Sequence, residues 1–283
     1  MLPKMKRLRV SAISYLNTAP LMWDFEHGLA VGSEFEVAYT LPSRCAARLK
    51  DGSADIGIIP AAAYTSIVDL LILPGVAIAS RRAVRSILLV SKVPLANIRT
   101  VALDNSSLTS IALLKVLFAK WWGGDRSFTL LAPDIQQMLT EHDAGLLIGD
   151  PALRVDRSQY ITYDLAEEWI RLTGKPFVFA FWAVRREALK HAGQDLDLAA
   201  VFQQSRDHGL APENLKQIAR KWELRMGLDQ DAIISYLTEN IYYYLDPECV
   251  DGMSLFFQYA QECGALPRAP ELHFLEPHRV AIL

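Results

Sequence analysis

The stretch Ser14-Tyr15-Leu16-Asn17-Thr18-Ala19-Pro20 decides how the first part of the chain is interpreted. It follows an apolar run, Leu8 to Ile13, that is typical of a buried strand, and it precedes a helix-like segment, Pro20 to Phe25. Asn17 and Thr18 are good helix caps. Because the first N–H groups of a helix have no partner inside it, this junction can hold an anionic group of a ligand. An ordinary capped loop between a strand and a helix would have the same residues.

The segments that follow alternate between strand-like and helix-like patterns. Residues 35–41, 42–50 and 54–59 are typical of a strand, a helix and a strand, and a second alternation of this kind runs from residue 100 to residue 148. Alternation with short loops predicts an α/β protein with mainly parallel sheets. In such a protein a ligand is expected near the carboxyl ends of the strands.

The order of these segments predicts two lobes joined by two crossings of the chain, near Ser91 and near Phe177. Lobe one would consist of residues 1–91 and 177–283, and lobe two of residues 92–176. The last part of the chain has a helical pattern and is expected to pack on the first lobe. Two lobes joined in this way form a cleft that can close on a small ligand.

Composition and charge exclude several classes of protein. The 283 residues carry a net charge of -3, with basic and acidic residues dispersed along the chain, so neither a nucleic acid nor a membrane surface is indicated as a partner. The three cysteines, Cys45, Cys249 and Cys263, form no CxxC pair, which suggests a reducing compartment. Because polar residues interrupt the first apolar run, we expect no signal peptide and a cytoplasmic protein.

The common catalytic motifs are also missing from the sequence. It contains no HExxH, Walker A lysine, GxSxG or GxGxxG, and its histidines are not at metal-ligand spacing, so we expect no metal and no cofactor. A second polar helix start, residues 104–110, has the same character as the opening stretch. Two such starts facing one cleft would suit a ligand with two carboxylates, although both can be plain caps. We expect the cleft to be lined by Asn17, Ser86, Ser106, Ser107 and the Gly149-Asp150 turn.

The opening stretch, followed by Pro20, resembles the N-terminal signature of the chorismate dehydratase family of the futalosine route to menaquinone. Further segments are similar to that family and occur in the same order: residues 84–89, 102–110, 147–150 and 172–180. The resemblance covers most of the chain to about Arg185. The sequence departs from the family at Lys175, where an apolar residue is usual, at Asn105, where threonine is common, and at Ala61, where serine often follows the proline.

This resemblance implies a two-lobed, type II periplasmic-binding-protein-like fold and a hydro-lyase reaction that converts chorismate to 3-[(1-carboxyvinyl)oxy]benzoate and water. Asn17 and Ser86 match polar active-site positions of the family and are the expected catalytic residues. The remaining expected contacts of the substrate are Ser14, Tyr15, Thr18, Ser106, Ser107, Thr109, Gly149 and Asp150, of which Ser106, Ser107 and Thr109 match the family's binding loop in the second lobe.

No side chain in these motifs is an obvious base for the reaction. Our hypothesis is that the side-chain carboxylate of the substrate accepts the proton, with Asp150 as the alternative. Two other functions stay open. One is 1,4-dihydroxy-6-naphthoate synthase, on the same fold but with a different N-terminal motif, and the other is a non-catalytic solute-binding protein, which would need export. The sequence leaves the oligomeric state open.

Overall fold

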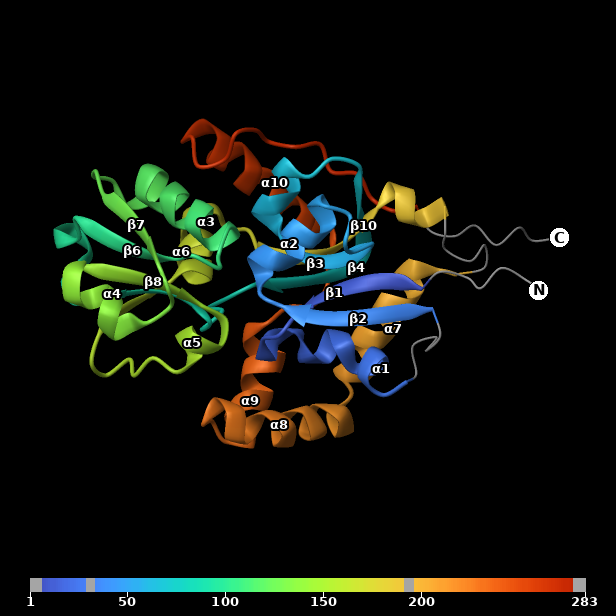
Figure 1. The fold of residues 1–283 in the computed structure, drawn as a ribbon. Helices are drawn as coiled ribbons and strands as arrows, with labels where there is room; N and C mark the ends of the chain where they lie inside the picture. Colours follow the sequence, from blue (N-terminus) through green and yellow to red (C-terminus); the bar gives the residue numbers. More distant parts are fainter. Residues whose placement is uncertain (1–6, 29–33, 191–195, 277–283) are drawn as a thin grey trace, which may run out of the picture.

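The computed structural model describes residues 7–28, 34–190 and 196–276, which form two lobes side by side (Figure 1). The sheet of the first lobe has the order β2-β1-β3-β10-β4, and that of the second has the order β7-β6-β8-β5-β9. The strands are β1 (Leu8–Ile13), β2 (Phe35–Thr40), β3 (Ile56–Pro60), β4 (Leu70–Ser80), β5 (Ile87–Ser91), β6 (Thr100–Asp104), β7 (Ser127–Leu131), β8 (Ala144–Ile148), β9 (Ile161–Asp164) and β10 (Phe177–Arg185).

Both sheets are mixed rather than mainly parallel. β1 is parallel to β2 and β3, and β6 is parallel to β7 and β8. In contrast, β10 is antiparallel to β3 and β4, and β5 is antiparallel to β8 and β9. The expectation of mainly parallel sheets is therefore wrong. β5 and β10 each follow a crossing between the lobes. Parallel neighbouring strands need a crossover helix that returns the chain to the same end of their sheet, and a crossing from the other lobe does not provide one.

Helices cover both faces of the first sheet (Figure 1). On one side lie α2 (Pro42–Lys50) and α10 (Pro247–Glu262), and on the other lie the 3-10 helix η1 (Leu16–Met22), α1 (Trp23–Glu26) and α7 (Leu198–Gly209). The other helical segments are η2 (Ala61–Ser66), η3 (Leu95–Asn97), α3 (Thr109–Leu117), η4 (Phe118–Trp122), α4 (Ile135–Glu141), α5 (Gly149–Leu153), α6 (Leu165–Thr173), η5 (Arg186–Lys190), α8 (Pro212–Met226), α9 (Gln230–Ser235) and η6 (Tyr236–Asn240).

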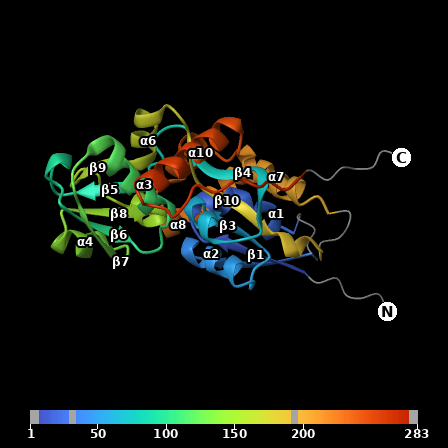
Figure 2. The ribbon, with the colours of Figure 1, turned by 90° about the horizontal axis from the view of Figure 1, so that it is seen from above.

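The C-terminal helices pack against the first lobe, as expected, and α10 also reaches the second. Figure 2 shows α10 lying across the junction toward α3. Lys120 Nζ, just after α3, lies 2.5 Å from Glu262 Oε2 at the end of α10. A Cβ atom on Gly252 of α10 would lie 2.2 Å from the carbonyl oxygen of Pro176, so glycine permits the close approach of α10 to the second crossing.

One expected helix ends early. The pattern of residues 230–245 predicts one helix, but η6 ends at Asn240 and the chain continues in an extended form. Tyr242 forms an antiparallel bridge with Ala79 at the edge of β4, and Ala77 N donates to the carbonyl oxygen of Tyr243 at 3.1 Å. The run of β-prone tyrosines pairs with an edge strand here, and this pairing overrides the helical spacing.

The first crossing lies earlier than expected. Ile87–Ser91 is β5 of the second sheet, so the chain leaves the first sheet after Ser80 and not near Ser91. The reason is that this apolar strand pairs on both sides with second-lobe strands. The division into residues 1–91 with 177–283 and residues 92–176 stays a prediction. Within it, β5 belongs to the sheet of the second lobe and not to that of the first.

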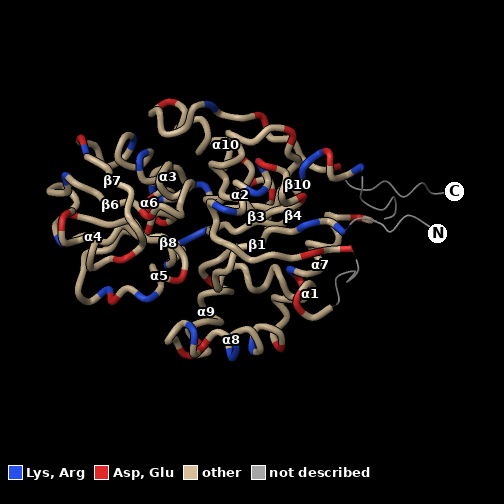
Figure 3. The backbone as a smooth tube through the Cα atoms, viewed as in Figure 1, with Lys and Arg blue, Asp and Glu red and all other residues tan. Residues whose placement is uncertain are grey.

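Charged residues are spread along the backbone of both lobes, with Lys and Arg interspersed among Asp and Glu (Figure 3). The part of the chain that the structure describes contains no helix long and apolar enough to cross a membrane.

Candidate active site

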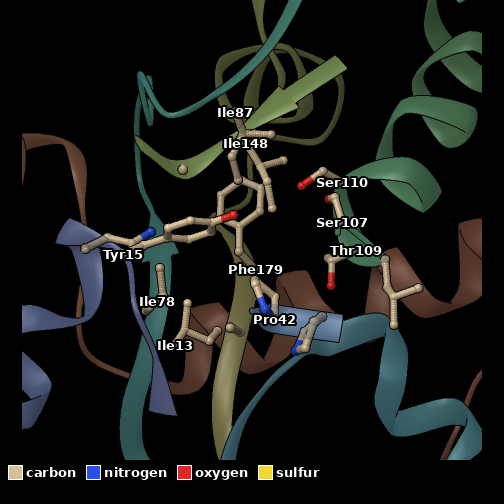
Figure 4. Close-up of a pocket in the computed structure, with 15 residues that line it drawn as sticks. Ile13, Tyr15, Pro42, Ile78, Ile87, Ser107, Thr109, Ser110, Ile148 and Phe179 are labelled. Carbon is tan, nitrogen blue, oxygen red and sulfur yellow. The ribbon is translucent and has the colours of Figure 1, made fainter. Parts of the chain in front are cut away.

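A cavity lies between the two lobes, with an empty volume of about 460 Å³ that includes its mouth to solvent (Figure 4). The carboxyl ends of β1 and β3 reach it from the first sheet, through Ile13 and Pro60, and that of β8 from the second, through Ile148. Ligands of open α/β sheets bind at such ends. The lining is largely apolar and, among the described residues, includes no Lys or Arg. Nor do the described residues include a group of three or more His, Cys, Asp or Glu that could hold a metal ion.

The cavity brings together half of the residues that the sequence singled out. Its lining includes Tyr15, Asn17, Ser107, Thr109 and Gly149. The other expected site residues contact the protein around the cavity and are not in its lining: Ser14, Thr18, Ser86, Ser106 and Asp150. The structure adds Ser110, which lay in the second polar stretch without a predicted role, and apolar residues such as Phe179.

The opening stretch forms the 3-10 helix η1, in which Asn17 and Thr18 lie inside the helix and neither caps it. The N-cap position is taken by Tyr15, with no side-chain hydrogen bond to the helix. The hydroxyl of Thr18 has two carbonyl acceptors, Ile13 O at 2.6 Å and Tyr15 O at 2.7 Å. Thr18 therefore holds the end of β1 to the start of η1.

The anion at the start of η1 is a carboxylate of the protein itself. Leu16 N donates to Asp150 Oδ1 at 2.9 Å, which joins η1 to α5 of the second lobe. Burial raises the pKa of Asp150, while the Leu16 N–H and the charge of Arg225 lower it. Arg225 Nη2 lies 3.8 Å from Asp150 Oδ2 and donates to Ser14 O at 2.9 Å. Ser14 and Asp150 thus belong to a contact between the lobes.

Ser86 is held by the backbone of the first crossing. The preceding residue, Arg85, has a φ of 61°, in the left-handed region that costs a residue with a side chain about 1 kcal/mol. Asp164 stabilises this turn, because its carboxylate accepts from Val84 N at 3.1 Å and from Arg85 N at 2.6 Å. Gly149 N donates to Ser86 O at 2.7 Å. The position of Ser86 is therefore fixed from the second lobe.

The buried polar atoms without a hydrogen-bond partner among the described residues include Asn17 Oδ1, Ser86 Oγ and Tyr236 Oη. The three side chains lie near one another, since Ser86 and Asn17 both lower the pKa of Tyr236, against the larger effect of burial, which raises it. An unpaired buried polar group costs about 1–3 kcal/mol, and such costs concentrate at functional sites. Sequence reasoning missed Tyr236, because a tyrosine in an apolar helical pattern is typical of a core residue.

The opposite side of the cavity is built from the second polar stretch. Ser106 donates to Asp104 Oδ1 from both its backbone N, at 2.9 Å, and its hydroxyl, at 2.6 Å. Thr109 Oγ1 accepts from Ala62 N of the first lobe at 3.1 Å. Helix α3 begins here without a side-chain cap or an acidic residue in its first turn. Its first N–H groups, with the hydroxyls of Ser107 and Ser110 (Figure 4), are therefore suited to an anion.

Tyr15 links the two sides. Its ring extends across the cavity (Figure 4) and packs on Gly149, where an added Cβ atom would lie 2.7 Å from two ring carbons. Gly149 has a φ of 61° as well, so both its conformation and this contact require glycine. Burial raises the pKa of Tyr15, and its interaction with Ser106 lowers it. Tyr15 thus approaches both Gly149 and Ser106 of the second lobe.

Solved structures with the same fold confirm the predicted two-lobed, periplasmic-binding-protein-like architecture. A protein from Archaeoglobus fulgidus superposes with a TM-score of 0.73 at 19% identity, covering 92% of this chain and 98% of its own. The periplasmic aliphatic sulphonate binding protein SsuA from Escherichia coli superposes with a TM-score of 0.65 at 19% identity, covering 99% of this chain and 96% of its own. At these identities the likeness concerns the fold alone.

Sequence relatives indicate a family as well as a fold. The chorismate dehydratase of Thermus thermophilus is 28% identical over 274 residues, which cover 90% of this chain and 94% of that protein. A family model described as menaquinone biosynthesis matches residues 8–262, which include both polar stretches and the residues of the cavity. The resemblance seen in the opening stretch is confirmed, and the chain belongs to the menaquinone biosynthesis family.

Proposed function

We propose that the chain is a chorismate dehydratase, a hydro-lyase that converts chorismate to 3-[(1-carboxyvinyl)oxy]benzoate and water in menaquinone biosynthesis. The observation that carries this proposal is a pair of buried atoms beside the cavity between the lobes, Asn17 Oδ1 and Ser86 Oγ, neither of which has a partner in the described part of the chain. They occur in a chain of the menaquinone biosynthesis family with a chorismate dehydratase among its relatives.

The reaction breaks a C–H bond at the ring carbon that bears the ether and the C–O bond of the neighbouring hydroxyl. The electron pair of the C–H bond forms a ring double bond, the ring becomes aromatic, and the hydroxide leaves with a proton as water. Aromatisation supplies the driving force. The protein has to hold two carboxylates, orient the departing hydroxyl and keep the cavity dry.

The second lobe would hold the ring carboxylate of chorismate. The uncapped start of α3 offers N–H groups, and Ser107, Thr109 and Ser110 add hydroxyls on the same side of the cavity. The apolar lining, with Phe179 and Ile148, would cover the ring. This arrangement needs no cation, in agreement with the lack of Lys and Arg among the described lining residues.

Asn17 and Ser86 would orient the substrate and form hydrogen bonds with the departing hydroxyl. Both carry a polar atom without a partner among the residues that the structure describes, so bonds to the substrate would replace no bond seen there. Positioning in a closed cavity contributes up to about 7–11 kcal/mol in favourable cases. Lowering of the barrier by positioning and polar contacts is therefore the main catalytic effect in this mechanism.

The side-chain carboxylate of the substrate would accept the ring proton. Asp150 is the alternative base, but its Oδ1 already accepts from Leu16 N. The variant Asp150→Asn separates the two, because Asn keeps an acceptor for Leu16 N and cannot take a proton. Activity retained in this variant supports the substrate carboxylate. A variant that binds product normally but has no activity would favour Asp150.

The experiment that tests the function is incubation of the purified protein with chorismate, without cofactor or added metal, followed by chromatography. Formation of the aromatic ether supports the dehydratase. Binding of a ligand without turnover would indicate a solute-binding protein, and production of dihydroxynaphthoate from a later intermediate would indicate the naphthoate synthase. A cytoplasmic location is part of the proposal, because Cys45, Cys249 and Cys263 are all free thiols, as is common in reducing compartments.

A further inference from the structure

Ser86 follows a strained turn in the first crossing between the lobes. The preceding residue, Arg85, has a φ of 61°, and Asp69 is the other non-glycine residue with a positive φ in the described part of the chain. A side chain makes this conformation unfavourable, so it persists only where neighbouring groups hold the backbone, and it concentrates at functional sites. The hydroxyl of Ser86 has no partner among the described residues. Contacts of the neighbouring backbone therefore determine where this hydroxyl lies.

Asp164, buried at the end of β9, holds this turn with one of its two carboxylate oxygens. Its Oδ2 accepts from Arg85 N at 2.6 Å. Its Oδ1 accepts from Val84 N at 3.1 Å and caps α6, where it accepts from Ala166 N at 3.1 Å and from Glu167 N at 3.2 Å. Capping of α6 accounts for Oδ1. It does not account for Oδ2, whose bond to the strained residue is a separate feature.

Two further bonds from the second lobe fix the backbone around Ser86. Arg157 Nη2 donates to Arg85 O at 3.0 Å, and Gly149 N donates to Ser86 O at 2.7 Å. Because peptide groups are planar, these contacts restrict the rotations on both sides of the Ser86 Cα atom, and so the direction of its Cβ atom. Of the two side chains that hold Arg85, Asp164 is buried and Arg157 is exposed, so the bond to Asp164 should contribute more.

We propose that Asp164 is a positioning residue, which holds Arg85 in its strained conformation through Oδ2 and thereby directs the hydroxyl of Ser86 toward the departing hydroxyl of the substrate. This inference rests on the proposed dehydratase function. Asp164 contacts no reacting atom and transfers no proton. Its carboxylate acts on the reaction only through the turn at Arg85. Loss of the Oδ2 bond should therefore lower kcat and leave KM nearly unchanged.

The test is the variant Asp164→Asn. The amide oxygen can take the place of Oδ1 and keep the cap of α6, while the NH2 group in place of Oδ2 cannot accept from Arg85 N. We expect kcat for chorismate to fall about 10- to 100-fold, with KM changed less than about threefold. Asp134→Asn is the matched control, since Asp134 caps α4 through Gln136 N and Gln137 N and lies outside the cavity lining. The control should keep its kcat.

A second substitution tests whether the effect passes through the strain at Arg85. Glycine adopts a positive φ freely, so in the Arg85→Gly background the turn depends less on Asp164. The loss of kcat caused by Asp164→Asn should then shrink to less than about threefold. Asp69→Gly is the control, because Asp69 has a φ of 55° and lies outside the cavity lining. It should leave the loss caused by Asp164→Asn unchanged.

The kinetics are measured well below the melting temperature of each variant, so that a loss of stability does not lower kcat. If Asp164→Asn does not fold, Arg157→Met takes its place, because it removes the exposed donor to Arg85 O and should lower kcat about 3- to 10-fold. Wild-type kcat in the folded variant, or a loss in Asp164→Asn that Arg85→Gly leaves unchanged, would overturn the inference and leave the proposed function standing. A wild-type protein that does not convert chorismate would overturn the proposed function, and this inference with it.

Discussion

The polar groups on the two sides of the cavity differ in whether the protein supplies their hydrogen-bond partners. The first wall consists of Asn17, which lines the cavity, and Ser86, which lies outside its lining, and their Oδ1 and Oγ atoms are buried without partners among the described residues. The second wall consists of Ser107, Thr109 and Ser110, which line the cavity, and of Ser106 before them; the hydroxyl of Ser106 donates to Asp104 and that of Thr109 accepts from Ala62 N. One wall leaves polar groups unsatisfied, and the other uses part of its polar groups to hold its own shape.

Under the proposed function, this difference indicates that one wall acts in catalysis and the other in substrate binding. Groups without protein partners can form their bonds with the transition state, and their loss should lower kcat. Groups that shape a helix start and its anion site should bind the substrate and transition state alike, and their loss should raise KM. Substitutions on the two walls separate an effect on kcat from an effect on KM.

The largest effect is expected for the first wall. Ser86→Ala should lower kcat by about 100- to 1000-fold with little change in KM, because it removes a donor to the departing hydroxyl. Since Ser86 Oγ has no partner among the described residues, the melting temperature should stay the same or rise slightly. Steady-state kinetics and a thermal melt check both. A variant with wild-type kcat and a lowered melting temperature would assign Ser86 to the fold instead.

The next largest effect is expected for the contact between Tyr15 and Gly149. Gly149→Ala places a Cβ atom 2.7 Å from the ring of Tyr15, and its N–H bond to Ser86 would shift as the backbone adjusts. We expect kcat/KM to fall about 10- to 100-fold.

Gly174→Ala is the matched control for this variant. Gly174 has a φ of 70°, and no atom lies within 4 Å of an added Cβ. It should lose about 1 kcal/mol of stability from backbone strain and keep its kcat/KM. Equal kinetic losses in the two variants would show that backbone strain alone, and not the contact with Tyr15, affects the site.

The second wall should show smaller losses, in KM. Ser107→Ala and Ser110→Ala each remove one hydroxyl at the start of α3, where the backbone N–H groups remain. A hydrogen bond to a carboxylate is worth about 1.5–3 kcal/mol, and the neighbouring donors offset part of its loss. We expect KM to rise about 5- to 10-fold with kcat within about threefold of wild type. A fall in kcat at constant KM would place these residues with the first wall.

The smallest effect concerns the pH dependence of stability. Burial raises the pKa of Asp150 above its ordinary value of 3.8, so the carboxylate is protonated more readily in the folded state than in the unfolded chain. Stability from this preference is present below pH 3.8 and is lost as the pH rises through the raised pKa. Asp150→Asn mimics the neutral form. Its melting temperature relative to wild type should therefore be higher at pH 7 than at pH 3.5.

The opposite trend in these melts would show that the contacts with Leu16 N, Arg225 and Arg154, which favour the ionised form, outweigh burial. Thermal melts of wild type and Asp150→Asn in buffers of equal ionic strength show whether burial or these contacts dominate.

The sequence predicts much of the fold because its signals are local. β1 runs from Leu8 to Ile13 and β8 from Ala144 to Ile148, as their apolar runs indicate. The polar residues that follow these strands, Asn17 and Gly149, meet at one cavity, because carboxyl ends of strands from both sheets face it. Strand direction within the sheets depends on the crossings between the lobes, and a local pattern does not contain that information.

The site was harder to predict where function depends on distant partners. Threonine at position 18 is typical of a helix cap or a ligand contact, but its hydroxyl donates to carbonyl oxygens of the neighbouring backbone. Asp150 follows a strand, as an active-site acid would, yet it holds the start of η1 in the other lobe. Tyr236 is more than 200 residues from Asn17 and approaches it only through tertiary packing.

The most direct test of the central claim is the kcat of Asn17→Ala for chorismate, measured beside Thr18→Ala. The two residues are neighbours in η1, but only Asn17 lines the cavity. We predict that Asn17→Ala loses at least about 100-fold in kcat and keeps its melting temperature. Thr18→Ala should lose about 1 kcal/mol of stability and keep kcat within about threefold. Near wild-type turnover in Asn17→Ala would contradict the assignment of catalysis to the first wall.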